Sequence, residues 1–523
     1  MSYAAAVDHL HGLTQELAAV APRRKFDLDH MRVLARALGD PQRQFRSILI
    51  AGTNGKGSTA ATLAGILAAA GVRTALYTSP HLARVTERIR VSGPRASTDN
   101  CQLSTVNCLS EIPEEDFARL YFRVDETARQ LVAAGRLPHH PSFFETLTAL
   151  AFLYFADQKT DGTVGKPVEI AILEVGMGGR LDATNIVDPL LSVLTDIALD
   201  HQEYLGNTVA EIAREKAGIL RPGGTLVTLP QHPEANQAIG EAAVALNVRG
   251  VNAADYLPGR SFDSLQRQAA PVSLKGTALA VPLSPPGEDG ALAPEVTLCS
   301  SPLHANRYDL LLDGEVVHVR SPLAGEHQRR NLALAIAAAI ELRNQFHYKI
   351  TNAAVEAGIA NTVWPGRLEF LPPNLLLDVA HNPAGAWALR AAIATLPEDR
   401  PSTLVFSCLR DKDLTEMSRI LFPLFDSPGA LDTPDAPAAS RVQHHIVLTH
   451  LDNPRAAGME NLVAAARALG IPAAQVARDP AAALALARSV TPAGGLIIVT
   501  GSIYLVGAVR QLVGAVRQAV EAE

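Results

Sequence analysis

The stretch that decides the fold is Ile48-Leu49-Ile50-Ala51-Gly52-Thr53-Asn54-Gly55-Lys56-Gly57-Ser58-Thr59. Its apolar start is typical of a buried strand, and residues 60–70 are expected to form the helix behind the glycine-rich turn. This order favours a phosphate-binding loop. The glycines let the backbone approach an anion, the freed N–H groups face it, and Lys56 adds positive charge. Gly57 stands where the common loop has Ser or Thr, so Ser58 is the first hydroxyl that can hold a magnesium ion.

The simpler interpretation of this stretch is a glycine turn that joins a strand to a helix without binding a ligand. Strand, turn, lysine, hydroxyl and helix nevertheless follow in the order that phosphate binding requires. The sequence therefore predicts a phosphate site directly after the strand that ends near Ala51.

Bulk composition narrows the class of protein. The chain has 523 residues, too many for one ordinary core, so two or three domains are expected. It is 48% hydrophobic and 19% charged, as in globular α/β proteins, and no apolar stretch reaches membrane-spanning length. The net charge of -7 argues against a nucleic-acid-binding surface. The N-terminus lacks a signal-peptide pattern.

Cysteine usage indicates the redox compartment. The four cysteines, Cys101, Cys108, Cys299 and Cys408, form no C-x-x-C pair and are too few for a disulfide scaffold. We therefore expect a reducing, cytoplasmic environment. Cys101 and Cys108 leave a disulfide or a metal site open as alternatives, besides the simpler one of two thiols in a polar loop.

Apolar strands alternate with helices through the first half of the chain. Strands are expected at 48–51, 73–77, 87–91, 168–175, 190–196 and 224–229, and helices at 3–20, 60–70, 114–134, 143–155 and 209–220. A further helix is expected to start within residues 26–31, with Asp27 or Asp29 as its N-cap. The pattern predicts a mostly parallel, doubly wound sheet, in which ligands bind beyond the carboxyl ends of the strands.

Several stretches interrupt this alternation. Residues 93–113 and 157–167 are polar and are expected to form loops or insertions. Residues 250–320 are rich in Pro, Gly and Ser, with short alternating runs that predict β-hairpins and loops. Alanine-rich helices are expected afterwards at 328–345 and 353–361.

The best domain boundary is Trp364-Pro365-Gly366-Arg367, because Pro and Gly end the preceding helix. We expect a first domain over 1–363, a linker over 364–367 and a second α/β domain over 368–523. Its elements are expected in alternation, with a polar loop at 426–442: strands at 375–379, 403–408, 445–449 and 495–500, and helices at 384–396, 412–424, 459–468, 480–489 and 504–520.

Motifs spread over most of the chain point to one family. In chain order they are 52–58, Thr78-Ser79-Pro80-His81-Leu82, Glu87-Arg88-Ile89, Phe143-Phe144-Glu145, 174–185, Asp200-His201, 214–218, 364–367 and 378–383. With them the chain resembles the folylpolyglutamate synthase and dihydrofolate synthase family of the Mur ligase superfamily. The resemblance implies an α/β fold with an N-terminal P-loop ATPase-like doubly wound sheet domain and a smaller C-terminal Rossmann-like α/β domain. The active site would lie in the cleft between them.

The resemblance also implies an activity, an ATP-dependent ligase that joins L-glutamate to a pteroate or folate carboxylate through an acyl phosphate. Its partners would be small molecules, ATP, L-glutamate and dihydropteroate or a reduced folate, with no nucleic acid or membrane, and it would act as a monomer. Bacterial chains of this pattern often add both the first and the later glutamates, so we expect both activities. Two anions meet in the phosphoryl transfer, so positive charge there is the main requirement.

Residue roles follow from the same resemblance. ATP would be contacted by the whole phosphate loop and by residues of later motifs: Gly52, Thr53, Asn54, Gly55, Lys56, Gly57, Ser58, Thr59, Asn331, Arg367, Asp378 and His381. Two magnesium ions are implied, and their ligands would be Ser58, Ser79, Glu174 and His201. Without the resemblance, His201 would suggest a transition metal, and Glu174 a solvated residue at a strand end.

The catalytic groups implied are Lys56, His201 and Lys216, with Lys216 carbamylated so that it helps to hold the second magnesium. A buried lysine with a lowered pKa is needed for that reaction with carbon dioxide, whereas most helix lysines are simply exposed. The pterin substrate would be met by residues 26–31 and, in the later motifs, by Pro80, His81, Arg88 and Asp182.

Two departures from the family pattern and two alternative functions remain. Val379 stands where the family usually has glycine, and Arg410 replaces a lysine in the stretch 409–413, which could meet glutamate or nucleotide or simply begin a helix.

One alternative function is a Mur-type ligase with a different acyl acceptor. The other is a nucleotide-dependent switch without ligase chemistry. The set of Glu174, His201 and Lys216 argues against the switch.

Overall fold

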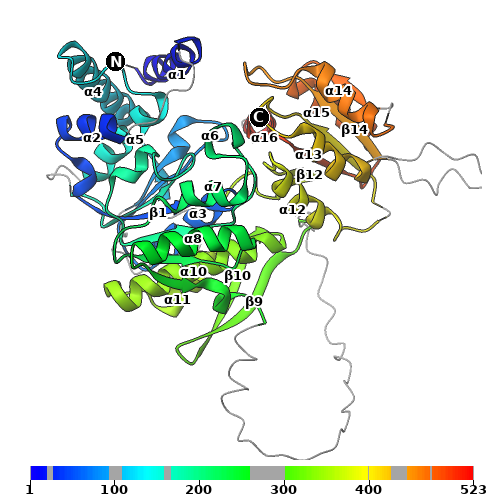
Figure 1. Ribbon diagram of the computed structural model, residues 1–523. Helices are drawn as coiled ribbons and strands as arrows, with labels where there is room; N and C mark the ends of the chain where they lie inside the picture. The colour runs from blue at the N-terminus through cyan, green and yellow to red at the C-terminus, as the bar shows by residue number, and fades with distance from the viewer. Residues whose placement is uncertain are drawn as a thin grey trace, which may run out of the picture.

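The computed structural model describes residues 2–20, 28–93, 109–157, 166–259, 301–398, 400–425, 444–471 and 474–521. Its strands form an eight-stranded sheet, a six-stranded sheet and a two-stranded hairpin. Figure 1 shows the eight-stranded sheet with its helices on the left and the six-stranded sheet with its helices on the right. The predicted α/β class, with a doubly wound N-terminal sheet and a smaller C-terminal α/β region, is confirmed.

The larger sheet has the strand order β4-β3-β2-β5-β1-β6-β7-β8. All neighbours from β2 to β8 in this order pair in parallel, while β3 and β4 form an antiparallel edge. The strand bounds are β1 Arg46–Ala51, β2 Thr74–Tyr77, β3 Ile89–Ser92, β4 Leu109–Glu111, β5 Ile170–Glu174, β6 Leu191–Leu194, β7 Thr225–Thr228 and β8 Arg249–Asn252.

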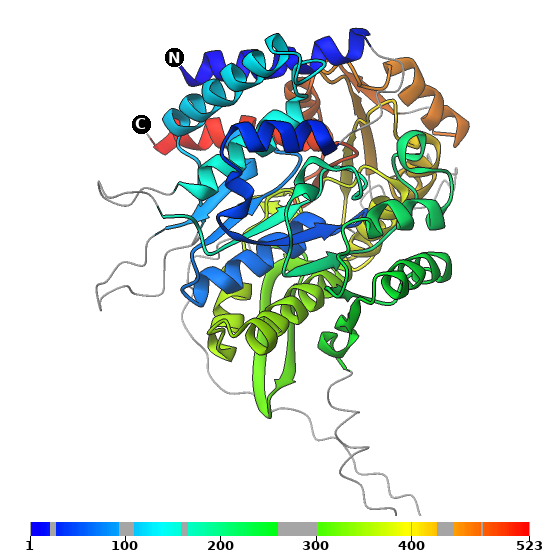
Figure 2. The same ribbon diagram turned by 60° about the vertical axis from the view of Figure 1, so that its left-hand side comes forward.

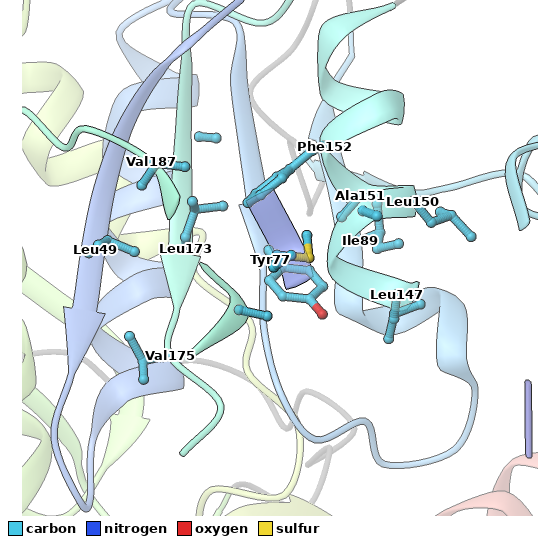
Figure 3. Packing of buried hydrophobic residues seen from close by; sticks show 14 of the residues in the cluster. Leu49, Tyr77, Ile89, Leu147, Leu150, Ala151, Phe152, Leu173, Val175 and Val187 are labelled. Carbon is cyan, nitrogen blue, oxygen red and sulfur yellow. The ribbon is translucent and has the colours of Figure 1, made fainter. Parts of the chain in front are cut away.

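Helices cover both faces of this sheet, and the side chains of each strand point alternately to one face and the other. Ile48 and Ile50 of β1 pack into one cluster with residues of three helices, α3 (Lys56–Ala69), α10 (Glu326–Phe346) and α11 (Asn352–Ala360). Leu49 packs on the opposite face, where α5 (Phe143–Ala156) and α4 (Glu114–Ala133) lie. Figure 3 shows Phe152 and Leu147 of α5 packed toward Tyr77 and Leu173 of the sheet.

Shorter elements complete the first region. The two-stranded hairpin of β9 (Ala305–Leu312) and β10 (Glu315–Ala324) is antiparallel and packs on α11. The remaining elements are α1 Tyr3–Val20, α2 Leu28–Ala37, η1 Pro41–Arg43, η2 Val85–Arg88, η3 Ala183–Ile186, α6 Gln202–Leu205, α7 Val209–Ala217, α8 Pro233–Ala245 and η4 Ala253–Tyr256.

The second sheet has the order β11-β12-β16-β13-β14-β15, with only β11 antiparallel. Figure 2 shows its strands and helices beside the first region. Its strands are β11 Glu369–Leu371, β12 Leu375–Leu377, β13 Ser402–Phe406, β14 His444–Thr449, β15 Gln475–Ala477 and β16 Leu496–Thr500. Its helices are α12 Pro383–Ile393, α13 Leu414–Leu421, η5 Phe422–Leu424, α14 Met459–Ala468, α15 Pro480–Val490 and α16 Ile503–Glu521.

The structure corrects several local predictions. Helix α3 begins at Lys56 rather than at residue 60, because Gly55 adopts a left-handed conformation and caps it there. Asp29 lies inside the first turn of α2 and is not its N-cap, while Asp27 lies outside the described residues. The segment expected as a loop at 93–113 contains β4, which pairs with β3 at the sheet edge.

Other sequence-based expectations are tested only in part. The hairpin expected within 250–320 is confirmed by β9 and β10, whereas residues 260–300 are outside the described part. Cys101, Cys108 and Cys299 also lie outside it, and Cys408 is a buried free thiol. Across the described ranges, no helix is both long and apolar enough to cross a membrane.

Candidate active site

The phosphate loop joins β1 to α3 at the carboxyl edge of the first sheet. Gly55 has a φ of 88°, and a Cβ there would lie 2.1 Å from Asn331 Oδ1. A Cβ at Gly52 would lie 1.8 Å from Thr195 Oγ1. No side chain fits at either glycine, so the backbone can approach an anion closely at the N-terminus of α3.

The extra glycine of this loop has a contact that the sequence did not indicate. A Cβ at Gly57 would meet the indole ring of Trp364 at 3.0 to 3.2 Å. Trp364 belongs to the segment between the two sheet regions, and the guanidinium of Arg90 lies 5.3 Å from its ring centroid. The indole therefore covers the position that the hydroxyl residue occupies in the common phosphate loop.

Two lysines converge on one carbonyl of this loop. Lys56 Nζ donates to Gly52 O at 3.1 Å and to Thr53 O at 3.0 Å, and Lys216 Nζ from α7 donates to Gly52 O at 2.8 Å. Burial lowers the pKa of both, and the nearby charge of Lys56 helps to lower the pKa of Lys216 to about 7. Lys216 is only 4% exposed, so it is not a solvated helix lysine.

Glu174 ends β5 beside the loop and is buried. Its Oε2 accepts a hydrogen bond from Ser79 N at 3.1 Å, which joins it to the segment after β2. Burial raises the pKa of Glu174, and the charge of Lys56 and the Ser79 N–H act in the opposite direction. Ser58 is buried in the first turn of α3. The structure thus places one carboxylate and two seryl residues around the loop.

His201 lies at the other side of the same sheet edge, as the N-cap residue of α6. Burial lowers its pKa to about 4, although Asp200 acts to raise it, so the imidazole is neutral at pH 7. A neutral imidazole is the form that binds metals. Its Nε2 lies 4.0 Å from Asp200 Oδ2.

Asp200 joins the two sheet regions. Its carboxylate accepts hydrogen bonds from Lys412 Nζ at 2.7 Å and from Asn382 Nδ2 at 3.2 Å, both from the second region. Asn382 Nδ2 also donates to Asn54 Oδ1 at 3.0 Å. Burial alone would raise the pKa of Asp200, but His201, Lys412 and His381 together lower it. The ion pair with Lys412 is buried, with side-chain exposures of 6% and 8%.

The nucleotide residues expected from the linker and the second region also lie near this edge. Burial lowers the pKa of Arg367. The carboxylates of Asp378 and Glu174 lie close enough to oppose this effect in part. Asp378 accepts backbone hydrogen bonds from Leu368 N at 3.0 Å and Ala380 N at 2.9 Å, so both oxygens hold the local turn. His381 Nε2 lies 3.8 Å from Asp200 Oδ2.

The expected substrate residues form a neighbouring group. Arg88 Nε donates to His81 Nδ1 at 2.8 Å, and the Arg88 guanidinium lies 5.3 Å from the Phe143 ring centroid. Burial and the charge of Arg88 lower the pKa of His81 to about 3. Pro80 follows Ser79 through a cis peptide bond. Asp182 accepts backbone hydrogen bonds from Gly176, Met177 and Thr184, so it shapes the loop after β5.

Sequence reasoning missed the residues that connect the two regions. Lys412 lies in a stretch whose simplest interpretation was a charged helix start, and Asp413 does cap α13. Asn382 and Asp200 lie in two of the family motifs, but no role was predicted for either residue. The charge of Lys412 could have indicated this contact, because a buried lysine needs an anionic partner.

The sequence also did not indicate a second pair, Asp196 and Arg330, which supports the phosphate loop. Asp196 O accepts backbone hydrogen bonds from Thr53 N at 2.8 Å and Asn54 N at 3.2 Å. Its carboxylate binds Arg330 of α10 through both oxygens, with a shortest distance of 2.6 Å. Arg330 directly precedes Asn331, the residue that packs on Gly55. The pair therefore ties the loop to the helix that carries an expected nucleotide contact.

Replacing Arg330 with methionine is expected to raise the KM for ATP by up to about fivefold, since a partly exposed ion pair contributes about 1 kcal/mol at most. Steady-state kinetics at saturating acceptor and glutamate measure this effect. Arg330→Lys should restore most of the affinity. The matched control is Arg329→Met on the same helix, because Arg329 pairs with Glu326 and Asn306 instead. Equal KM values for the two methionine variants would contradict the assignment.

The donor set fits magnesium better than a softer metal. Glu174, Ser58 and Ser79 offer oxygen donors, which magnesium prefers. Within the described ranges, no group of three or more His, Cys, Asp and Glu side chains is arranged to hold a metal ion by itself. A magnesium ion here would therefore rely on hydroxyls and on phosphate oxygens of a nucleotide, as is usual for magnesium in phosphoryl-transfer sites.

Comparisons with known proteins agree with this geometry. The Mur ligase middle domain matches residues 149–339, and the Mur ligase glutamate ligase domain matches residues 366–503. The dihydrofolate synthase/folylpolyglutamate synthase of Bacillus subtilis is 30% identical over 489 residues, covering 92% of this chain and 94% of that protein. The Mycobacterium tuberculosis protein of the same name is 33% identical over 510 residues, covering 94% and 91%.

Solved structures match over nearly the whole chain. Mycobacterium tuberculosis folylpolyglutamate synthase complexed with ADP has a TM-score of 0.72 and 28% identity, covering 97% of this chain and 98% of that chain. Escherichia coli FolC in complex with DHPP and ADP has a TM-score of 0.70 and 25% identity, covering 99% of each.

The two sheet regions and the phosphate loop at the edge of the first sheet define a Mur ligase, an enzyme that uses ATP to form an amide bond. Within that class the chain belongs to the dihydrofolate synthase/folylpolyglutamate synthase family. It is therefore an ATP-dependent ligase that adds glutamate to a folate-type acceptor. This assignment decides against both a different acyl acceptor and a nucleotide switch.

Proposed function

We propose that this enzyme adds glutamate to dihydropteroate as well as to reduced folates. The proposal is supported by relatives that carry both names in one chain, including those of Bacillus subtilis and Mycobacterium tuberculosis. The observation that carries it is the site itself, where Lys56 and Lys216 donate to Gly52 O of the phosphate loop and Glu174 accepts from Ser79 N of the loop that bears His81. The same site would serve both acceptors, since each presents a carboxylate.

The reaction that this site suits proceeds in two steps. The acceptor carboxylate attacks the γ-phosphorus of ATP, the bond to the β-phosphate breaks, and ADP leaves. The glutamate amine then attacks the acyl carbon, inorganic phosphate leaves, and the amine loses a proton. Lys56 and the backbone of residues 52–59 would bind the phosphates, with Arg367 adding charge from the linker. Asn331, Asp378 and His381 would bind the rest of the nucleotide.

Magnesium would complete this charge compensation. Ser58, Ser79 and Glu174 would hold one ion and Glu174 and His201 a second, and the ions would neutralise charge on the transferring phosphoryl group. The neutral state of His201 supports its part as a ligand. Carbamylation of Lys216 is supported by its burial and its pKa of about 7, which leaves a large neutral fraction to react with carbon dioxide.

Substrate positioning would fall to Pro80, His81, Arg88 and Asp182 and to residues 26–31, of which 28–31 begin α2. The domains proposed are 1–363 and 368–523, joined by 364–367, and this division is supported by the separate sheets on either side. We further propose a monomer that acts in the cytoplasm, which suits the buried free thiol of Cys408.

Turnover of one purified sample on two acceptors tests the function. We expect ADP release with dihydropteroate and with a reduced folate, each only when L-glutamate is present. Release with one acceptor alone would restrict the enzyme to one activity. ATP hydrolysis that needs neither glutamate nor acceptor would contradict ligation altogether. Product analysis by mass spectrometry checks that the glutamate has been added.

A further inference from the structure

Three residues on one face of α16 contact the first region and strand β11, which directly follows the connecting segment, residues 364–367. Gly507, Arg510 and Gln511 are spaced so that they share a side of the helix. Gln511 Nε2 donates to Ala83 O at 3.3 Å, and Arg510 Nε donates to Glu369 Oε1 at 3.0 Å. We call Gly507, Arg510 and Gln511 the α16 docking face.

Gly507 makes the closest of these contacts. A Cβ at this position would lie 2.0 Å from Leu82 O and 2.8 Å from Leu82 C, so helix and loop meet backbone to backbone. Glycine inside a helix is unfavourable, and a packing reason is expected when it occurs there. Here the reason is the approach of Leu82, whose side chain also packs against the hydrophobic cluster of the second region.

The loop that meets Gly507 is held firmly on its own side. Glu87 accepts backbone hydrogen bonds from Leu82 N at 2.8 Å, Ala83 N at 3.1 Å and Arg84 N at 3.0 Å. A side chain at Gly507 therefore cannot be accommodated by a small shift of this loop. We therefore expect α16, and the second region with it, to move away from the loop.

The same docking face supports the connecting segment indirectly, through Glu369 at the start of β11. The Glu369 carboxylate accepts a hydrogen bond from Arg510 Nε and another, at 2.8 Å, from Gly366 N of the segment that contains Trp364 and Arg367. The loop on the other side continues back to Ser79, whose N–H donates to Glu174. One helix face thus contacts the loop proposed to position the acceptor and, through Glu369, supports the segment that carries Arg367.

We propose that the α16 docking face sets the distance between the second region and the loop around Leu82, which is proposed to position the acceptor. Gly507 would then be a positioning residue for ligation. This inference rests on the ligase function described above. At the docked distance Lys412 and Asn382 reach Asp200 and Asn54. A larger distance separates these groups and misplaces Arg367 relative to the phosphate loop.

Gly507→Ala tests the proposal, with Gly514→Ala as the matched control. Gly514 lies on the same helix, and a Cβ there would meet nothing within 4 Å. Both changes raise helix propensity, so neither should lower the melting temperature through the helix itself. A displacement of about 1 Å can cost about a hundredfold in rate. We expect such a loss of kcat, a higher KM for the acceptor and a larger radius of gyration by small-angle scattering for Gly507→Ala only.

The outcomes separate this inference from the assigned function. Equal kcat, acceptor KM and radius of gyration in the two alanine variants would overturn the docking role, while ligation by the wild type would still support the function. Absence of ligation in the wild type would overturn the function itself. Should Gly507→Ala not fold, Arg510→Met decides. A lower kcat at an unchanged melting temperature supports the proposal, and an unchanged kcat overturns it.

Discussion

Replacing Lys216 with alanine is expected to abolish ligation while leaving the fold intact. The side chain is buried, and its amine donates a hydrogen bond to Gly52 O of the phosphate loop at 2.8 Å. If the amine carries a carbamate, its loss removes an anionic oxygen ligand from the second magnesium. Initial rates of ADP release and glutamate incorporation measure the effect. The exposed residue Lys349 offers a control, and Lys349→Ala should retain the wild-type rate.

Two further readouts separate the carbamate from a merely structural lysine. Formate or acetate added to Lys216→Ala should restore part of the rate, because a small carboxylate can occupy the vacated space. In the wild type, the pKa of Lys216 is lowered from 10.5 to about 7, so the neutral amine is available above that pH. Ligation and the nuclear magnetic resonance signal of isotope-labelled carbamate should therefore fall together below about pH 7. Full activity in Lys216→Ala would disprove the hypothesis.

The second large effect is expected for Glu174→Gln, which keeps the shape of the side chain and removes its charge. We expect kcat to fall by about two to three orders of magnitude, the range seen when one electrostatic contact to a transition state is lost. The apparent affinity for magnesium should fall as well. Glu169→Gln is the matched control, since Glu169 directly precedes the same strand but is 46% exposed.

Stability provides an independent check of the Glu174 variant. Burial raises the pKa of this carboxyl, so ionisation is less favourable in the folded state than in the unfolded state. The charged group therefore costs stability above its folded pKa, and a neutral amide should leave the free energy of unfolding unchanged or higher. A variant that is less stable and equally active would contradict both the role of Glu174 and the electrostatic argument.

The parts of the fold predicted best were those fixed by local patterns. The strand, glycine turn and helix around residues 48–69 were recognisable because apolar periodicity and glycine punctuation act over short distances. Strand β4 was missed because its residues, Leu109–Glu111, carry no apolar alternation and form a strand only through pairing with β3. Aspartate is a common N-cap residue, but α2 already begins at Leu28, so Asp29 lies in its first turn.

The site shows the same division. Lys216 and Glu174 were selected by resemblance, and their burial and contacts fit the proposed roles. The pair of Asp200 and Lys412 is separated by more than two hundred positions in the chain, and no local pattern encodes such a contact. Which oxygens and amides meet across the two regions depends on how the regions dock, and docking depends on surfaces rather than on periodicity.

The indole of Trp364 over Gly57 constrains how this protein can change over evolutionary time. The ring lies 3.0 to 3.2 Å from where a side chain at position 57 would begin. A side chain at position 57, as in the common phosphate loop, would therefore press on the indole, which would have to shift by a few tenths of an ångström. A smaller residue at position 364 would relieve this contact but would lose the indole packing between the connecting segment and the loop. Substitutions at the two positions are therefore coupled, and the unusual glycine accommodates the linker as well as the phosphate.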